Sequence, residues 1–326
     1  MEKKNVLVTG IGGNVGQGIV RNIRKTGFEI RVVGTNINNF SAGNHLCDGF
    51  YKVPYAYESS FIAEIKEIVA TERIDLIIPS TDYEVYYLSA HQKELGCEVA
   101  ASEPAVAGAY LDKYLTADLH GQFGVPFAAT FLPSAYDHRF KEFIVKPRKG
   151  RGSRGLFFNP PNISKFSDEE YIVQELCKGQ EVTTAFYVDA GNHLHGHITM
   201  SRSLENGTTT YCAVTRTYDY QFQELLTNLA AHIPIKGAAN IQSIITDKGE
   251  IIPFEVNCRI SGTNSIRSNF GFEDVRYTLE ELLYGRKPTP VRVTDGVAVR
   301  ILMDVIYPGQ TGSEGLTDNQ TPFFIY

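Results

Sequence analysis

The stretch GAANIQSIITDKGEIIPFEVNCRISGTNS, residues 237–265, decides the fold. Two runs rich in β-branched residues flank the sequence DKGE, a pattern typical of a β-hairpin turn. If the turn is centred on its middle peptide bond, Gln242 lies directly opposite Glu255 in the paired strands. Asn257 comes two residues after Glu255, so it points to the same face of the sheet.

This hairpin gathers one carboxylate and two amide oxygens on one face, and Arg259 follows on the same side. Oxygen ligands of this kind suit Mg²⁺, which usually shares them with substrate phosphates. The alternative is an ordinary polar outer face of a sheet. Such a face more usually carries Lys, Thr and Glu than Gln, Glu, Asn and Arg in this order. The hairpin therefore predicts a metal and phosphate site.

A basic, glycine-rich loop lies upstream, in FIVKPRKGRGSRG at residues 143–155. A short apolar strand leads to Lys146, and the glycines and arginines follow directly. Successive glycines let backbone N–H groups converge on an anion. The loop does not match the Walker A pattern, and a solvated basic turn is the alternative.

The segment YIVQELCKGQEVTTAFYV, residues 171–188, predicts a strand, a tight turn at Lys178-Gly179 and a second strand. Glu175 lies near the end of the first strand and Glu181 just beyond the turn. By themselves these two carboxylates are surface residues.

Strands alternate with helices in the first hundred residues, which indicates a doubly wound parallel sheet. Apolar runs predict strands at 5–10, 28–36 and 73–81. Helical patterns fill residues 14–25 and 59–73 between them.

The glycine-rich turn TGIGGNVGQG, residues 9–18, raises the question of NAD binding. The second strand ends VGTN and offers no acid to a ribose hydroxyl. The chain also lacks the Tyr-x-x-x-Lys pattern of a short-chain dehydrogenase. We therefore disfavour a dehydrogenase and predict that these glycines are structural or line the substrate side.

The third of these strands ends IIPSTDYE, where the carboxyl ends of parallel strands form a ligand cleft. Thr81, Asp82 and Glu84 are candidates to line that cleft. Helix N-capping by Ser80, Thr81 or Asp82 is the favoured explanation of these polar residues.

Together, Lys113, Lys146 with its loop, QELCKGQE and FEVNCRISG resemble the ATP-grasp superfamily. The likeness is to the nucleotide-binding units of carbamoyl phosphate synthase large chain and of biotin carboxylase. It implies a mixed α/β and α+β fold. A Rossmann-like pre-ATP-grasp domain would occupy residues 1–105 and an ATP-grasp domain residues 106–326. Within the latter it implies a flexible lid subdomain at about 112–175 and a catalytic subdomain at about 176–310.

The resemblance also implies a role for individual residues. Arg259 and Lys146 are the expected catalytic residues, and Arg259 stabilises an acyl phosphate. The implied magnesium ligands are Gln242, Glu255 and Asn257. The implied ATP contacts, which reach phosphates, adenine and ribose, are Lys113, Lys146, Arg148, Gly152, Ser153, Glu175, Leu176 and Glu181.

The activity so implied is that of an ADP-forming, carbon–nitrogen bond-forming ligase. It joins a small carboxylate, such as an amino acid, to an amine through an acyl phosphate. The cofactors are ATP and Mg²⁺, with Mn²⁺ as the alternative metal. Arg202 and Arg267 are candidate clamps for the substrate carboxylate, and surface arginines are the alternative. Bicarbonate activation, as in the two named families, and a non-catalytic ATP-binding regulator are the other hypotheses.

The composition of the chain argues against several other classes of protein. A formal charge of −6 and a pI near 5.8 give no general support for nucleic-acid binding. The five cysteines are scattered, which disfavours a disulfide framework or a zinc site. No apolar run is long enough for a membrane span. We expect a cytoplasmic protein with small-molecule partners, and a homodimer is consistent with the resemblance.

Three histidines alternate at positions 193, 195 and 197, which predicts three imidazoles on one strand face. A metal site is one interpretation of this pattern. A polar strand face is the favoured one.

Overall fold

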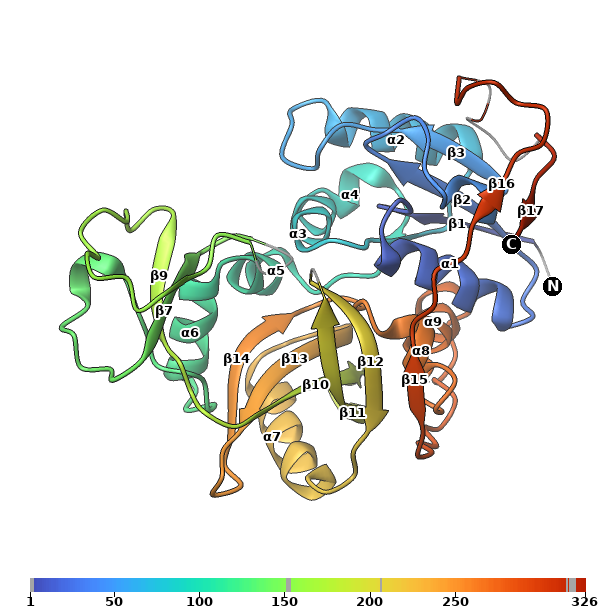
Figure 1. The fold of residues 1–326 in the computed structure, drawn as a ribbon. Helices are drawn as coiled ribbons and strands as arrows, with labels where there is room; N and C mark the ends of the chain where they lie inside the picture. The colour runs from blue at the N-terminus through green and yellow to red at the C-terminus, as the bar shows by residue number, and fades with distance from the viewer. Residues whose placement is uncertain (1–2, 151–153, 206, 315, 317–320) are drawn as a thin grey trace.

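The computed structural model describes residues 3–150, 154–205, 207–314, 316 and 321–326. Figure 1 shows a parallel-sheet domain followed along the chain by two further sheet units. The first domain holds a five-stranded parallel sheet in the order β3-β2-β1-β4-β5. Its strands are β1 (Lys4–Val8), β2 (Ile30–Asn36), β3 (Gly49–Lys52), β4 (Leu76–Ile78) and β5 (Glu98–Val99).

Helices cover both faces of this sheet, which explains why its strands are continuous apolar runs. Val6 and Val8 of β1 pack toward α1, whereas Leu7 packs on the opposite side. The helices of this domain are α1 (Asn14–Lys25), α2 (Phe61–Glu72), α3 (Asp82–Ala90) and α4 (Gln92–Leu95).

The predicted helices and strands are confirmed, and α1 has the predicted bounds. The sequence prediction missed β3, and it took β4 for the third strand in chain order. The four residues of β3 are partly or fully exposed, so this edge strand lacks the apolar run that identified the others.

Two helices and a four-stranded sheet follow. The helices are α5 (Pro104–Leu111) and α6 (Lys113–Gln122), and the sheet has the order β6-β9-β7-β8. Tyr136, Phe166 and neighbouring apolar residues give this sheet a core of its own. Its strands are β6 (Thr130–Phe131), β7 (Phe143–Pro147), β8 (Phe157–Phe158) and β9 (Tyr171–Glu175).

The third unit is a six-stranded antiparallel sheet in the order β14-β13-β10-β11-β12-β15. Helix α7 (Asp219–His232) covers one face, and residues of the parallel-sheet domain pack on the other. The strands are β10 (Gln180–Val188), β11 (Leu194–Glu205), β12 (Thr208–Val214), β13 (Gly237–Ile245), β14 (Ile251–Asn257) and β15 (Val297–Val299).

Short elements complete the chain. They are the α-helices α8 (Asn264–Arg267) and α9 (Asp274–Thr278), the 3₁₀ helices η1 (Asn44–Leu46) and η2 (Pro133–Ala135), the π-helix η3 (Leu279–Leu283), and the ribbon of β16 (Val305–Ile306) with β17 (Phe324–Ile325). Along the part of the chain that the structure describes, no helix combines the length and apolar character that crossing a membrane requires.

The predicted hairpin at residues 171–188 is wrong in one respect. Both strands exist, but β9 belongs to the four-stranded sheet and β10 to the six-stranded one. Gly179 lies between them with φ +150°, and a Cβ there would meet the carbonyl oxygen of Ile245 at 2.0 Å. The glycine therefore serves a close passage over the end of β13.

The β13–β14 hairpin confirms the predicted pairing of Gln242 with Glu255. Near the turn the register differs by one, because Ile245 faces Ile251. A β-bulge at Phe254 absorbs the difference. The bulge thus restores the predicted register where the polar residues begin.

The three histidines do not share one face. His193 precedes β11, and a bulge at His195 interrupts its pairing with β10. His195 donates to the carbonyl oxygen of Thr289 at 2.9 Å, whereas His197 lies near Phe222 of α7. The bulge explains the error, because it adds one residue to the alternation.

Candidate active site

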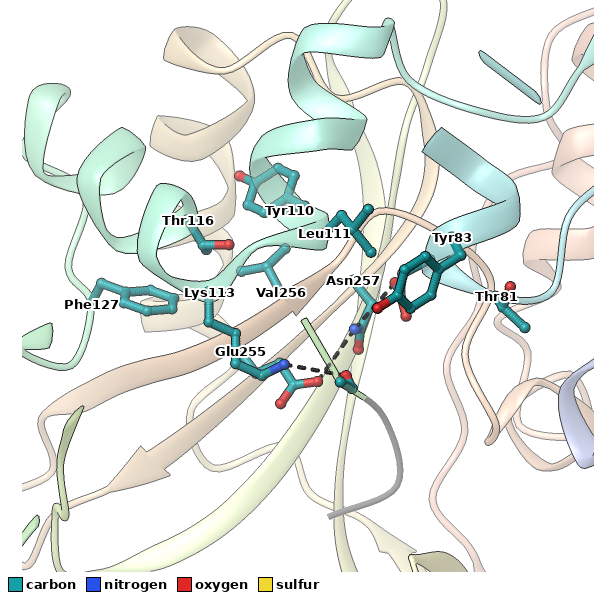
Figure 2. A pocket seen from close by; sticks show the side chains of 12 residues that line it. Thr81, Tyr83, Tyr110, Leu111, Lys113, Thr116, Phe127, Glu255, Val256 and Asn257 are labelled. Carbon is teal, nitrogen blue, oxygen red and sulfur yellow. Dashed lines mark hydrogen bonds between the residues drawn. The ribbon is translucent and has the colours of Figure 1, made fainter. Parts of the chain in front are cut away.

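Glu255 lies at the centre of a pocket between the parallel-sheet domain and the two later sheets (Figure 2). Its Oε1 accepts a hydrogen bond of 3.4 Å from Nδ2 of Asn257. Burial by itself would raise the pKa of Glu255, but the charges of Lys113, Lys146 and Arg259 and the hydrogen bond from Asn257 together outweigh it and lower that pKa. The pocket therefore holds an ionised carboxylate between two lysines.

Lys113 is the first residue of α6, and the preceding Asp112 caps the helix through the N–H groups of Tyr114 and Leu115. The Nζ atom of Lys113 donates to the carbonyl oxygen of Gly150 at 3.3 Å. The cap thus fixes the start of α6, and with it the direction in which Lys113 enters the pocket.

Arg148, an expected ATP contact, forms an ion pair of 2.8 Å with Asp112. It also donates to the carbonyl oxygen of Asp168 at 2.7 Å. These bonds tie the end of β7 to α6. The structure thus places Arg148 in the support of Lys113, with its side chain engaged by protein groups.

Lys146 on β7 is only 6% exposed. Its Nζ donates to the carbonyl oxygen of Phe254 at 3.4 Å and lies 5.5 Å from the centre of the Phe254 ring. Burial lowers the pKa of Lys146 to about 8, Glu255 opposes this shift, and Lys113 adds to it. The bulge at Phe254 is what turns this carbonyl toward Lys146.

Arg202 joins two predicted site residues. Its guanidinium pairs with Oε1 of Glu181 at 2.8 Å and donates to Oε1 of Gln242 at 2.6 Å. Glu181 is the expected ribose ligand, so Arg202 lies on the nucleotide side of the sheet. The bonds to these partners use Nε and Nη2 of Arg202, so a role in holding a substrate carboxylate falls to Nη1 while both partners are kept.

Arg259 and Asn257 reach the parallel-sheet domain through Asp82. Arg259 Nη2 donates to Asp82 Oδ2 at 2.8 Å, and Asn257 Nδ2 donates to Asp82 Oδ1 at 3.3 Å. The Nε of Arg259 is buried and has no hydrogen-bond partner among the described residues. An arginine with an unused Nε donor thus lies beside Asp82, which lines the pocket.

The predicted capping of α3 is confirmed. Thr81 Oγ1 accepts from the Glu84 N–H at 3.3 Å, and Glu84 Oε2 accepts from the Thr81 N–H at 3.0 Å. Asp82 is then free of the cap, so it extends into the pocket. Thr81 and Asp82 both line the pocket, as the cleft hypothesis expected.

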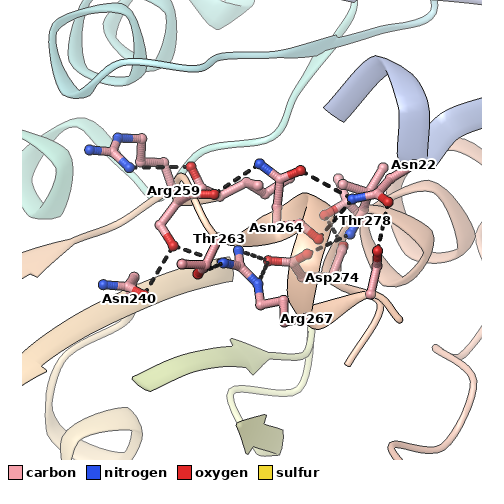
Figure 3. A network of polar contacts seen from close by, with 12 residues as sticks. Asn22, Asn240, Arg259, Thr263, Asn264, Arg267, Asp274 and Thr278 are labelled. Atoms are coloured by element: carbon pink, nitrogen blue, oxygen red, sulfur yellow. Dashed lines mark hydrogen bonds and ion pairs between the residues drawn. The ribbon is translucent and has the colours of Figure 1, made fainter. Parts of the chain in front are cut away.

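Arg267 is fully buried. It forms an ion pair with Asp274 and donates to Ser261 Oγ at 2.8 Å and to Thr263 Oγ1 at 2.7 Å (Figure 3). Because the whole side chain is enclosed, it offers no surface to a substrate carboxylate. We therefore infer that Arg267 has a structural role and does not contact the substrate.

The expected adenine contacts lie where the chain passes from one sheet to the next. Glu175 is the exposed last residue of β9, and the N–H of Leu176 donates to the carbonyl oxygen of Glu142 at 3.1 Å. Two other expected ATP contacts, Gly152 and Ser153, lie outside the described residues.

Sequence reasoning missed Asp112, Phe254 and Tyr83. An Asp directly before a helix is a capping signal, so the role of Asp112 could have been predicted from the sequence. Phe254 acts through its backbone carbonyl at a bulge. No residue-type pattern identifies such a role.

The donor set fits Mg²⁺. Glu255 supplies a carboxylate, and Asn257 directs its Nδ2 to Asp82 and Glu255, which leaves its Oδ1 for a cation. The oxygen of Gln242 keeps a second lone pair beside its bond to Arg202. Among the described residues, no group of three or more His, Cys, Asp or Glu is placed to hold a metal. A set with one carboxylate and two amides does not require such a group.

Two family models match the chain. A PylC-like N-terminal domain matches residues 6–100, and an ATP-grasp domain matches residues 111–263. A comparison with curated proteins found no match.

Several solved structures share the fold over most of their length. PurK, an N5-carboxyaminoimidazole ribonucleotide synthetase in complex with ADP, aligns with a TM-score of 0.74 and 13% identity, covering 92% of this chain and 82% of that one. The Staphylococcus aureus N5-carboxyaminoimidazole synthetase, complexed with ADP, gives 0.73 and 12%, with the same coverage.

The biotin carboxylase domain of Hydrogenobacter thermophilus 2-oxoglutarate carboxylase gives a TM-score of 0.71 and 14% identity, covering 90% of this chain and 73% of that one. These likenesses confirm the predicted fold class, in which a parallel-sheet domain precedes an ATP-grasp domain. The chain therefore has a PylC-like N-terminal domain followed by an ATP-grasp domain, and the predicted relation to the ATP-grasp superfamily is confirmed.

Proposed function

We propose that the chain is an ATP-dependent carboxylate–amine ligase that works through an acyl phosphate. Its carboxylate substrate is an amino acid or another small acid. The observation that carries the proposal is the electrostatic environment of Glu255: Lys113 lines the same pocket, and the charges of Lys146 and Arg259 also act on this carboxylate. Three cations gathered in an acidic chain suit the phosphates of ATP and an acyl phosphate.

The residues act by holding and neutralising charge, as is usual in phosphoryl transfer. Lys113 and Lys146 hold the phosphates of ATP, and Arg259 stabilises the acyl phosphate. Gln242, Glu255 and Asn257 hold the metal. When bound, Mg²⁺ offsets negative charge on the phosphoryl group that is transferred.

The remaining contacts form the nucleotide side of the site. Glu175 and Leu176 recognise adenine, and Glu181 holds the ribose. We also propose that residues of about 112–175 form a lid subdomain, because the four-stranded sheet with its own aromatic core lies within this range. The catalytic subdomain then spans about 176–310, and we propose a cytoplasmic location for the chain.

Bicarbonate activation is the second candidate. It is favoured by the likeness to the biotin carboxylase domain, whose structure contains MgADP, ADP and bicarbonate. A bicarbonate-activating enzyme would use the same ATP site and the same arginine.

The test is ADP release by the purified chain with amino acids offered in pairs, and with bicarbonate in a separate arm. We expect release only when a carboxylate, an amine and Mg²⁺ or Mn²⁺ are all present. Calorimetric titration with ATP and with NAD(H) accompanies the assay. Binding of NAD(H) without binding of ATP, or ADP release that ignores every carboxylate, contradicts the proposal.

A further inference from the structure

Asp82 is a second carboxylate in a pocket that is otherwise suited to anions. It comes from α3 of the parallel-sheet domain, and its side chain is 18% exposed. Like charges repel, so Asp82 disfavours a phosphate beside it unless a cation lies between them. The presence of this carboxylate therefore needs an explanation that the ATP site does not supply.

The present partners of Asp82 are Arg259 and Asn257. Arg259 is the residue that stabilises the acyl phosphate in the proposed function. When Arg259 turns to the acyl phosphate, the 2.8 Å ion pair between Arg259 and Asp82 is broken. A partly buried carboxylate without a counter-charge is unfavourable, so a replacement cation is expected beside it.

The surroundings of Asp82 suit an organic cation. Tyr83, the next residue, lines the same pocket, as Figure 2 shows. Tyr57 packs edge-on against Tyr83 with ring centres 5.8 Å apart, and Tyr55 stacks on Tyr57 at 5.2 Å. Aromatic faces attract ammonium groups. Tyr55 and Tyr57 are 39% and 55% exposed, so this row of rings leads from solvent to Tyr83, which lines the pocket with Asp82.

We propose that Asp82 and Tyr83 bind the amine substrate as an ammonium ion. This inference rests on the proposed ligase function. It assigns to the parallel-sheet domain the recognition of the nucleophile, while the ATP-grasp domain activates the carboxylate.

The bound ammonium loses one proton to solvent, and the freed nitrogen lone pair bonds to the acyl carbon. The bond from that carbon to the bridging oxygen breaks, and its electron pair leaves on phosphate. The new amide nitrogen gives its second proton to the departing phosphate.

Hydroxylamine provides the test, because it is uncharged at neutral pH and attacks acyl phosphates without an ammonium form. The probes are a mixture of the standard amino acids with acetate, succinate and bicarbonate, with and without hydroxylamine. Amide formation is followed by phosphate release, and hydroxamate by its ferric colour. We expect Asp82→Asn to lower kcat/KM for amines by about 10- to 100-fold and to leave hydroxamate formation unchanged.

The matched control is Asp219→Asn. Asp219 is also the first residue of a helix and also pairs with an arginine, Arg216, but it lies on α7, which covers the opposite face of the six-stranded sheet. This variant is expected to match the wild type in both reactions. If Asp82→Asn does not fold, Asp82→Ser replaces it, since serine is also tolerated at the start of a helix.

The outcomes are distinct. Equal loss of amide and hydroxamate means that Asp82 only holds the two domains together, and it overturns the inference. Unchanged amide formation in the variant overturns it as well. Absence of hydroxamate from the wild-type chain instead overturns the proposed function, and this inference with it.

Discussion

Glu255 is the one charged member of the proposed metal set, and two lysines act on its charge. A glutamine at this position keeps the shape of the side chain but leaves Lys113 and Lys146 without an anion between them. We expect Glu255→Gln to lower kcat by about 100-fold, the scale of losing one electrostatic contact to the transition state. Turnover and melting temperature are to be measured on one sample across a magnesium titration.

A purely structural role for Glu255 gives a different result: normal turnover per folded molecule with a lowered melting temperature. Glu250→Gln is the control, since Glu250 belongs to the turn of the same hairpin. Near wild-type turnover of Glu255→Gln at saturating magnesium would refute the metal role.

Glu181 gives a second prediction for a single residue. If it holds the ribose hydroxyls, Glu181→Ala weakens ATP binding by about 1–3 kcal/mol, the range for unpaired hydrogen-bonding groups. The same change releases Arg202 from its ion pair. Calorimetry with ATP measures the effect, and Glu205→Ala on β11, the neighbouring strand that carries Arg202, serves as control. Equal ATP affinity in the two variants would count against the ribose role.

The position of a single residue could be predicted where the pairing of a hairpin determines it. The opposition of Gln242 and Glu255 follows from the hairpin alone, and the structure confirms it. The burial of Arg267 was not predictable, because its partner Asp274 belongs to the next helix and only tertiary packing brings the two together. The sequence identifies an arginine but not whether it faces solvent or core.

Among the elements, α6 links the proposed ATP site to the core. It begins at Lys113 in the pocket, and near its other end it carries His120, which has no exposed surface. His120 Nδ1 lies 3.4 Å from the carbonyl oxygen of Pro126, and Nε2 lies 3.3 Å from the Tyr110 hydroxyl. A carbonyl only accepts, so Nδ1 carries the proton, and Nε2 of the neutral ring accepts from Tyr110.

This burial predicts a pH dependence of stability. It lowers the pKa of His120 to about 4 in the folded state, whereas an unfolded histidine has about 6.5. The unfolded chain therefore binds the proton first. The stability that neutral His120 provides is complete above pH 6.5 and is lost as the pH falls toward 4, by about 3 kcal/mol in total.

We expect His120→Gln to lose less stability than the wild type between pH 7 and pH 4.5. Urea unfolding at the two values measures the difference, and carboxylates that titrate in both chains cancel in the comparison. His232→Gln is a control at an exposed helix end. Parallel loss of stability in wild type and His120→Gln would contradict a neutral, buried His120.

Hydrophobic periodicity predicted some features of the helices and strands and missed others. Periodicity located α1, α2, β13 and β14, because each buries a regular face. It could not place β9 and β10 in different sheets, since both carry the same apolar alternation. It also missed the bulges at His195 and Phe254, which add one residue without changing composition.

At the scale of the whole molecule, a buried polar network joins the parallel-sheet domain to the ATP-grasp domain (Figure 3). Asn22 of α1 donates to Oδ1 of Asn264 at 3.1 Å, and Asn264 donates to the carbonyl oxygen of Ser261 at 2.8 Å. Ser261 in turn bonds Arg267 and lies two residues from Arg259. The loop that carries the arginine of the pocket is thus held against α1.

The glycine-rich turn belongs to this junction. A Cβ on Gly18 would lie 2.3 Å from Oδ1 of Asn264, and one on Gly16 would lie 2.6 Å from the carbonyl oxygen of Gly10. These contacts support the structural interpretation of the glycines. The resemblance to a dinucleotide turn thus reflects close packing of α1, which sequence alone does not separate from phosphate binding.

The close contact between Gly18 and Asn264 predicts an unusual effect of alanine on the free energy of unfolding. Alanine normally stabilises a helix interior by about 0.5–1 kcal/mol relative to glycine. At Gly18 we expect the reverse, a loss of about 1–3 kcal/mol, because the fully buried Asn264 has no room to retreat. Urea unfolding of Gly18→Ala measures this loss. Gly121→Ala in α6, where a Cβ meets open space, is the control and should not destabilise.

Combining Gly18→Ala with Asn264→Ala separates the clash from a general effect on α1. Asn264→Ala removes the obstructing oxygen and also the bonds to Val15 and Ser261, so it destabilises the chain by itself. Adding Gly18→Ala to that background should cost less than adding it to the wild type, with a coupling of about 0.5–3 kcal/mol. Strict additivity of the two changes would show that α1 does not meet Asn264 at this point, and the junction would then have to be held by other contacts.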